Sequence, residues 1–275
     1  MLQSSIGTLL KGFIIGGTML VPGVSGGSMA MIIGIYDRLI SSVSSFMKHK
    51  KESFVFLLLF CVGAVAGMLL LARPLLRLIE LYPLPAMYFF IGAVAGGIPL
   101  IFRQSGVRTF SIKIPLYIVL GAGAVVLLSF LPSAAATAQM EPGPVSFLLL
   151  ALSGFIAAVA LILPGISVSY LLLLMGLYNE TMRAISTLYF PFLIPLALGL
   201  VLGILLTTKL LDTAMKKHPQ PTYLIILGFI LGSIVTIFPG VPTSWDTLYC
   251  ILTLAAGYAA IRLLSRAEEK SAGKS

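Results

Sequence analysis

Long apolar stretches dominate the chain, separated by short polar segments. Six of them are long enough to cross a bilayer: 53–72, 84–102, 114–131, 188–208, 222–238 and 248–264. Each approaches the roughly 20 residues that about 30 Å of hydrocarbon requires of an α-helix. We therefore expect an all-α polytopic membrane protein, with a single membrane domain over residues 1–275.

The hydrophobic pattern also contains an internal duplication. Residues 12–36 align without a gap on 154–178, with eight identities in 25 positions, and 63–102 align on 199–238, with 13 in 40. A unit of about 140 residues is too long for a solenoid repeat and is typical of a duplicated transporter. The expected organisation is a first repeat over 1–131, a second over 145–264, and a cytoplasmic tail over 265–275.

Composition supports a membrane protein and excludes a soluble one. Hydrophobic residues make up 59% of the chain, charged residues 10%, and the mean hydropathy is +1.07. A soluble domain of this length could not cover itself with so little polar surface. The net charge of +9 comes from residues at the ends of the stretches, which favours topology signals facing anionic lipid over nucleic-acid binding.

Two smaller features fit the same class of protein. Cys61 and Cys250 fall inside predicted spans and are expected to be apolar packing residues. The first residues carry neither a charged n-region nor a small-residue cleavage site, so no signal peptide is expected.

Charge counting predicts how the repeated segment 12–36 meets the membrane. If both copies return to the side they enter from, 15 Lys and Arg residues lie on one face, and only Arg73, Arg77 and Arg183 lie on the other. The division would be 10 to 8 if both copies crossed, and 14 to 4 if only the first did. The positive-inside rule favours returning segments with both termini cytoplasmic. An even number of crossings is required, so re-entrant and fully spanning hairpins both remain open.

With returning segments, each half of the chain holds one hairpin and three spans. Because three is odd, the second half enters the membrane from the opposite face. The expected fold is therefore two inverted-topology repeats, each a re-entrant Pro-Gly hairpin plus three transmembrane helices. In such folds the substrate sits near the membrane midplane, between the repeats.

Each hairpin breaks at a Pro-Gly pair, and polar residues follow it. Arms of about ten residues, 12–21 and 28–36 in the first copy, would each reach about 15 Å, so the tip would lie near the bilayer centre. Serine and glycine at the start of the returning arm are good N-caps that leave amide donors free. Two helix N-termini meeting there predict a site for phosphate or carboxylate. The alternative is that these residues only kink ordinary, closely packed helices.

Four basic residues are secondary candidates for guiding an anionic headgroup: Arg73, Arg77, Arg183 and Lys209. Arg73 and Lys209 are aligned, each at the far end of the first span in its half. Interfacial snorkelling is the alternative role for such side chains. Tyr36 and Tyr178 are expected to anchor the arm ends at the membrane interface.

Several functional classes are disfavoured by what the chain lacks. No acidic residue is expected in mid-span, which disfavours a pure cation antiporter. The sequence 23–26 matches the GxSG motif of rhomboid intramembrane proteases, but a serine nucleophile needs a base. His49 and His218 are both expected in cytoplasmic loops. We therefore expect no enzyme, no catalytic residues, no metal site and no cofactor.

Two motifs carry a resemblance to a known family. The chain reads PGVSGGSMAMIIGIYDRLI from Pro22 and PGISVSYLLLLMGLY from Pro164. With the duplicated hairpin-plus-spans pattern, they resemble, over essentially the whole chain, a bacterial and archaeal family identified as polyprenyl-phosphate transporters. The resemblance implies a flippase of the bacterial cytoplasmic membrane. It would return undecaprenyl phosphate to the cytoplasmic leaflet, where the carrier is reloaded for peptidoglycan and other envelope polymers.

The resemblance also implies the headgroup contacts. They are Pro22, Gly23, Ser25, Gly26, Gly27 and Ser28 in the first tip, and Pro164, Gly165, Ser167 and Ser169 in the second. Val168 and Ser169 align on Gly26 and Gly27, so the second tip lacks the double glycine.

The residues alone predict an anion site, and only the resemblance supplies the lipid. We expect a cavity open sideways to the bilayer, with the polyprenyl tail outside it and the phosphate on Ser25, Ser167 and the tip amides. Rocking of one repeat against the other would expose the site alternately. The expected partners are the polyprenyl phosphate and membrane lipids. A channel or exchanger for a small soluble anion is the alternative, and a closed aqueous path would favour it.

Overall fold

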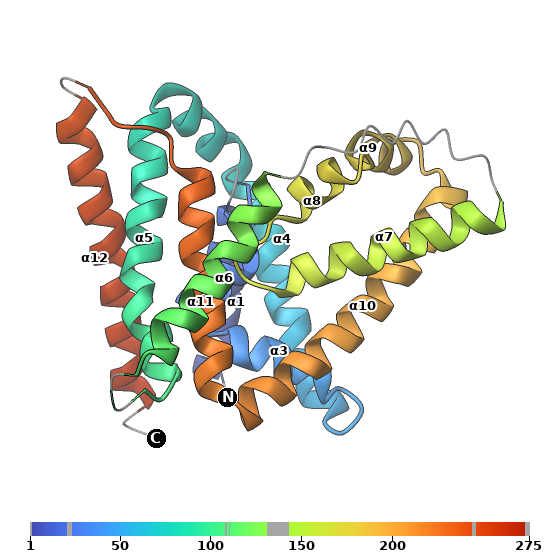
Figure 1. Cartoon of the computed structure of the whole chain (residues 1–275), viewed down its shortest axis with the longest axis horizontal. Coiled ribbons are helices and arrows are strands. Elements are labelled where there is room, and N and C mark those ends of the chain that lie inside the picture. Colours follow the sequence, from blue (N-terminus) through green and yellow to red (C-terminus); the bar gives the residue numbers. More distant parts are fainter. Residues whose placement is uncertain are drawn as a thin grey trace.

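The computed structural model describes residues 2–20, 24–107, 109, 111–130, 143–243 and 246–272. All regular structure within these residues is helical (Figure 1). In chain order the helices are α1 (Leu2–Thr18), α2 (Gly26–Ile32), α3 (Tyr36–Ser44), α4 (Lys50–Leu81), α5 (Pro83–Gln104), α6 (Lys113–Ser129), α7 (Pro144–Ile162), α8 (Val168–Leu174), α9 (Tyr178–Ser186), α10 (Phe190–Lys217), α11 (Pro219–Ile237) and α12 (Asp246–Ala272).

Six helices are long and apolar enough to cross a membrane: α4, α5, α7, α10, α11 and α12. Five of them overlap most or all of a span expected from the sequence, so a polytopic helical membrane protein is confirmed. The sixth expected span, 114–131, forms the shorter apolar helix α6 of 17 residues. In its place α7, the first arm of the second hairpin, reaches spanning length with 19 residues.

The long helices pack as four pairs, and each pair crosses at glycine. The pairs are α1 with α4, α7 with α10, α5 with α12, and α6 with α11. At Gly67 a Cβ atom would lie 2.0 Å from the backbone oxygen of Phe13, and at Gly92 it would lie 2.0 Å from that of Leu254. Small residues thus let the backbones approach closely, which is how helices associate in lipid.

The glycines at these crossings recur at the spacing of the duplication. Gly12 and Gly154 are 142 residues apart, and four further pairs are 136 apart: Gly63 with Gly199, Gly67 with Gly203, Gly92 with Gly228, and Gly121 with Gly257. Each of these glycines meets the backbone or a methyl group of its partner helix. The α1–α4 pair therefore corresponds to α7–α10, and the α5–α12 pair corresponds to α11–α6.

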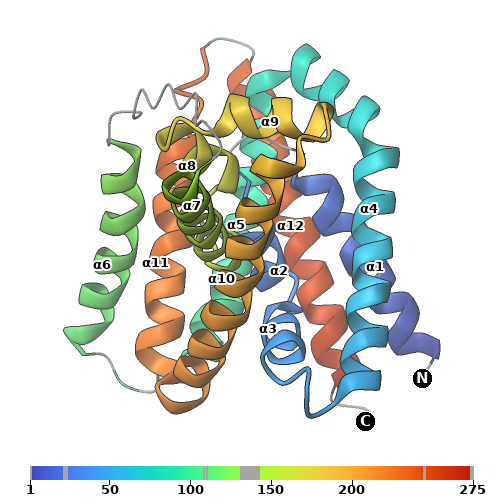
Figure 2. The ribbon, with the colours of Figure 1, turned by 90° about the vertical axis from the view of Figure 1, so that its right-hand side faces the viewer.

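The two views agree on how the elements are arranged from end to end. The start of α1 and the end of α12 lie at the same end of the molecule (Figures 1 and 2). Helix α3 lies at that end, and α9 lies at the opposite end. We refer to these as the α3 end and the α9 end.

The segments after the two Pro-Gly breaks are shorter than the expected arms. The returning arm of the first hairpin is only seven residues, Gly26–Ile32, while the entering arm belongs to a 17-residue helix. Gly34, with φ +75°, ends the returning helix, and Ile35 N–H bonds back to the carbonyl of Ala30. Gly176 repeats this cap with φ +70°. Glycine tolerates the left-handed conformation that such a helix stop needs, and after it α3 and α9 begin.

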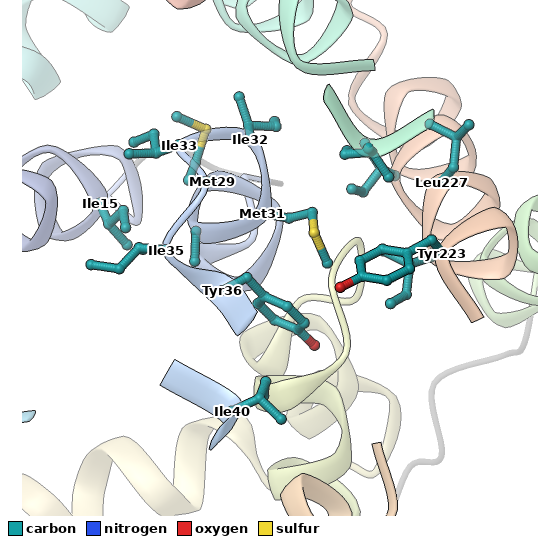
Figure 3. Close-up of a cluster of buried hydrophobic side chains, with 14 of the residues drawn as sticks. Ile15, Met29, Met31, Ile32, Ile33, Ile35, Tyr36, Ile40, Tyr223 and Leu227 are labelled. Atoms are coloured by element: carbon teal, nitrogen blue, oxygen red, sulfur yellow. The ribbon is translucent and has the colours of Figure 1, made fainter. Parts of the chain in front are cut away.

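The largest buried cluster lies where the first hairpin meets the second half of the chain. Met31 and Ile32 of α2 and Ile230 of α11 are fully buried. Figure 3 shows α2 and α3 side chains on one side and those of Tyr223 and Leu227 on the other. This packing fixes the position of the first tip.

Candidate functional site

The first tip is the start of α2. Ser25 is the N-cap residue, 9% exposed, and its hydroxyl makes no capping hydrogen bond. Ser28, one turn into the helix, is 3% exposed, and its Oγ has no hydrogen-bond partner. A buried hydroxyl without a partner is uncommon in native proteins, and a bound water, ion or ligand is one way in which such a group is satisfied. Pro22 and Gly23 lie outside the described residues.

The second tip is better satisfied by its own helix. Ser167 caps α8, and its Oγ accepts a hydrogen bond from Tyr170 N at 3.4 Å. Pro164 is fully buried, while Ser169 is exposed. Gly165 has φ +86° and touches the α11 backbone, where a Cβ atom would lie 2.4 Å from Phe229 O. The two tips therefore differ in how many of their polar groups remain available.

The tips lie against each other, as expected from the sequence. A Cβ atom on Gly27 would lie 3.3 Å from the Cα of Pro164 and 3.4 Å from the carbonyl oxygen of Ile162. The hydroxyl of Tyr36 donates to the same carbonyl at 2.6 Å. Tyr36 is 3% exposed, so the expected interfacial anchor is wrong. It is a core residue that ties α3 to the end of α7.

One cavity borders each tip. The first, of about 250 Å³, is lined by Gly26, Gly27, Tyr36, Ile162 and Thr208, together with apolar side chains of α1, α3 and α4. The second, of about 410 Å³, lies between α6, α8 and α11, and its polar lining consists of Ser129, Ser167, Tyr170 and Thr236. Among the described residues that line the two cavities, none is Lys or Arg. An anion in either cavity would be bound by hydrogen bonds from hydroxyl and amide groups.

The four secondary candidates lie away from the tips. Arg73, Arg77, Arg183 and Lys209 are all exposed. Arg183 forms an ion pair with Glu180 on its own helix. None of the four lines either cavity, so any guiding role would be exerted from the surface of the helices.

Sequence reasoning missed a polar group between the halves of the chain. Asp37 of α3 accepts a hydrogen bond from the hydroxyl of Tyr223 at 2.9 Å and faces Gln104 Nε2 at 3.5 Å. Burial raises the pKa of the Asp37 carboxyl, and the bond from Tyr223 opposes that shift. Asp37 Oδ1 and Gln104 Oε1 are buried without partners. Asp37 directly follows the repeated motif, but nothing in the sequence pairs it with a tyrosine 186 residues away.

The fold defines a polytopic α-helical membrane protein in which two breaks in the helices lie close to each other. The family model for undecaprenyl phosphate translocase-like proteins of the VCA0040-like type matches residues 15–248. The chain belongs to this family.

Two curated relatives are similar over most of their length. The polyprenyl-phosphate transporter of Staphylococcus aureus (strain NCTC 8325 / PS 47) is 31% identical over 248 residues, covering 86% of this chain and 87% of that protein. The polyprenyl-phosphate transporter of Vibrio cholerae serotype O1 (strain ATCC 39315 / El Tor Inaba N16961) is 30% identical over 255 residues, covering 87% and 80%. No solved structure matches the chain.

Proposed function

We propose that this protein is a flippase for undecaprenyl phosphate that recycles the lipid carrier across the bacterial cytoplasmic membrane. It acts as a transporter and not as an enzyme. The phosphate binds between the two hairpin tips near the midplane, and the polyprenyl tail stays in the bilayer. Family membership and the names of both relatives support the lipid class.

The observation that carries the proposed site is the contact between the tips. Gly27 and Pro164 come from breaks about 140 residues apart, yet a Cβ atom on Gly27 would lie only 3.3 Å from the Cα of Pro164. Ser25 and Ser28 flank Gly26 and Gly27 in the chain, and neither hydroxyl is used in a capping hydrogen bond. Serine hydroxyls and free amides at helix starts are suitable donors for a phosphate oxygen. We assign Ser25, Gly26, Gly27 and Ser28 as the principal headgroup contacts, with Pro164, Gly165, Ser167 and Ser169 completing the site.

The proposed architecture is a pair of inverted repeats, 1–131 and 145–264, followed by the cytoplasmic tail 265–275. Its support is the recurrence of the helix pairs and of their crossing glycines at the duplication spacing. The α3 end would be cytoplasmic, because all basic residues except Arg73, Arg77 and Arg183 are assigned to that face. Rocking of one repeat against the other would give alternating access to the tips.

Native mass spectrometry of the purified protein tests the substrate and the site together. Undecaprenyl phosphate is offered with undecaprenol and phosphatidylglycerol as competitors. We expect selective retention of undecaprenyl phosphate, because only this lipid combines the polyprenyl tail with a terminal phosphate. Retention should weaken in the Ser25→Ala/Ser167→Ala variant, which removes a hydroxyl from each tip.

The matched control is Ser153→Ala/Ser186→Ala, which removes two hydroxyls that bond to their own helices. It should retain the lipid as the unchanged protein does. Binding no tighter than phosphatidylglycerol would contradict the lipid substrate and favour a soluble-anion channel. If the tip variant and the control variant retained undecaprenyl phosphate equally, the assignment of the phosphate to the two tips would be contradicted.

A further inference from the structure

The two ends of the molecule are packed differently, although the duplication gives them equivalent helices. At the α3 end, α3 packs against α10. The corresponding pair at the α9 end is α9 with α4, and among the described residues it has no comparable packing. In Figure 2, α3 lies between α10 and α4 at the α3 end.

A second pair of equivalent positions shows the same difference. Helix α2 packs on α5, where a Cβ atom on Gly97 would lie 2.6 Å from the side chain of Ile32. Ile32 is completely buried. The equivalent helices α8 and α11 have no comparable packing, and the cavity of about 410 Å³ lies between them and α6. Ile32 thus fills the space between α2 and α5, whereas a cavity borders the equivalent helices α8 and α11. The smaller cavity of about 250 Å³ lies against α1, α3 and α4 instead.

Polar contacts reinforce the packed end. The Tyr223 hydroxyl of α11 donates to Asp37 of α3 at 2.9 Å. Ser44, at the end of α3, donates to Asp212 Oδ2 of α10 at 3.1 Å. In Figure 3 the hydroxyl groups of Tyr36 and Tyr223 turn toward the same region between the halves. Helix α3 is therefore bonded to two helices of the second half.

Within the part of the chain that the structure describes, the equivalent positions at the α9 end do not form these bonds. By the duplication spacing, Asn179 stands where Asp37 does, Met87 where Tyr223 does, and Leu76 where Asp212 does. Among the described residues, the side-chain hydrogen bonds of α9 stay within that helix and the turn after it. Other bonds join the halves at that end: the Tyr170 hydroxyl of α8 donates to the carbonyl oxygen of Ser129 at the end of α6 at 3.1 Å, and Tyr88 of α5 donates to Gly240 O at 3.0 Å. The bonds that hold α3 to α10 and α11 are specific to the α3 end.

We propose that the Asp37–Tyr223 hydrogen bond is a latch that holds the α3 end shut, and that the structure represents the state whose tips are reached from the α9 end. Release of this latch lets α3 separate from α10 and α11 while α9 closes on α4. This rests on the proposed alternating access, and it assigns Asp37 and Tyr223 a positioning role, away from the phosphate. Breaking one bond to a charged group should change the ratio of the two states roughly tenfold.

Two cysteine pairs report on the two ends without any substrate. In a Cys61→Ala/Cys250→Ala background, Ser44→Cys/Asp212→Cys reports closure at the α3 end. Leu76→Cys/Ser186→Cys occupies the equivalent positions at the α9 end. With a short bifunctional thiol reagent in lipid nanodiscs, the first pair should cross-link efficiently and the second poorly. Adding Tyr223→Phe, which keeps the ring and removes the donor, should lower the first yield and raise the second.

Three further variants separate a latch from a general loss of packing. Asp37→Ala should behave as Tyr223→Phe does, whereas Asp37→Asn should retain most of the first yield, because its amide oxygen still accepts the bond. Tyr258→Phe on α12, whose side chain is 42% exposed, should change neither yield. Unchanged yields in both Tyr223→Phe and Asp37→Ala would overturn the latch, as would a fall at the α3 end with no gain at the α9 end. Because no polyprenyl phosphate is present, this outcome is independent of whether the proposed substrate is correct.

Discussion

At the scale of single residues, the two tips show why equivalent positions need not be equivalent in function. Ser25 and Ser167 occupy the same place in the duplication and both precede a seven-residue helix. Only the Ser167 hydroxyl oxygen accepts a capping hydrogen bond from its own helix. The N-cap role could be predicted from residue type, because serine is a preferred cap. Which serine remains available depends on a backbone geometry that the pattern does not encode.

This difference separates the stability effects of the two serines from their binding effects. Ser167→Ala should lower the free energy of unfolding by about 0.5–1 kcal/mol, because a capping bond is lost. Ser25→Ala should leave stability nearly unchanged and still weaken undecaprenyl phosphate retention. Thermal unfolding of the two single variants, followed by native mass spectrometry, checks both statements. A larger stability loss in Ser25→Ala than in Ser167→Ala would contradict the assignment of Ser25 as an available ligand.

At the scale of elements, hydrophobic length predicted the long helices well and the hairpins less well. Five expected spans are confirmed because each is a long apolar run, and neither Pro99 of α5 nor Pro195 of α10 ends its helix. The returning arm was predicted as 28–36, but the helix stops at Ile32, because Gly34 adopts a left-handed conformation. That glycine is visible in the sequence at both equivalent positions. Because apolar residues continue on either side of this glycine, the hydrophobic pattern did not predict that the helix ends there.

Crossing glycines give a test of the helix pairs. Gly92→Leu and Gly228→Leu should each destabilise the protein by roughly 1–3 kcal/mol or more, because no space exists for the side chain between the backbones. Gly123→Leu on α6 is the control, since no atom lies within 4 Å of a Cβ there. Thermal unfolding in detergent measures all three. Equal stability of the Gly92 and Gly123 variants would contradict the observed α5–α12 crossing.

At the scale of the whole molecule, the duplication predicted that the tips would meet, and it could not predict that the ends would differ. A repeat predicts equivalent partners, whereas a transporter at rest must occupy one state and so break that equivalence. The asymmetry depends on Asp37, Tyr223 and Asp212, whose counterparts are apolar or uncharged. No local pattern connects these three residues, so only the folded chain identifies them as a group.

The most direct test of the central claim is flipping in reconstituted vesicles that contain undecaprenyl phosphate in both leaflets. A phosphatase added outside hydrolyses only the outer-leaflet phosphate. In protein-free vesicles, hydrolysis should therefore stop when about half of the undecaprenyl phosphate has been converted. With the protein present, hydrolysis should run to completion, because inner-leaflet lipid is brought out. With Gly27→Val, which places a branched side chain against Pro164, hydrolysis should stop at about half of the lipid. With Gly123→Val it should run to completion. Hydrolysis that stops at one half with the unchanged protein, or runs to completion with Gly27→Val, would contradict transport through the paired tips.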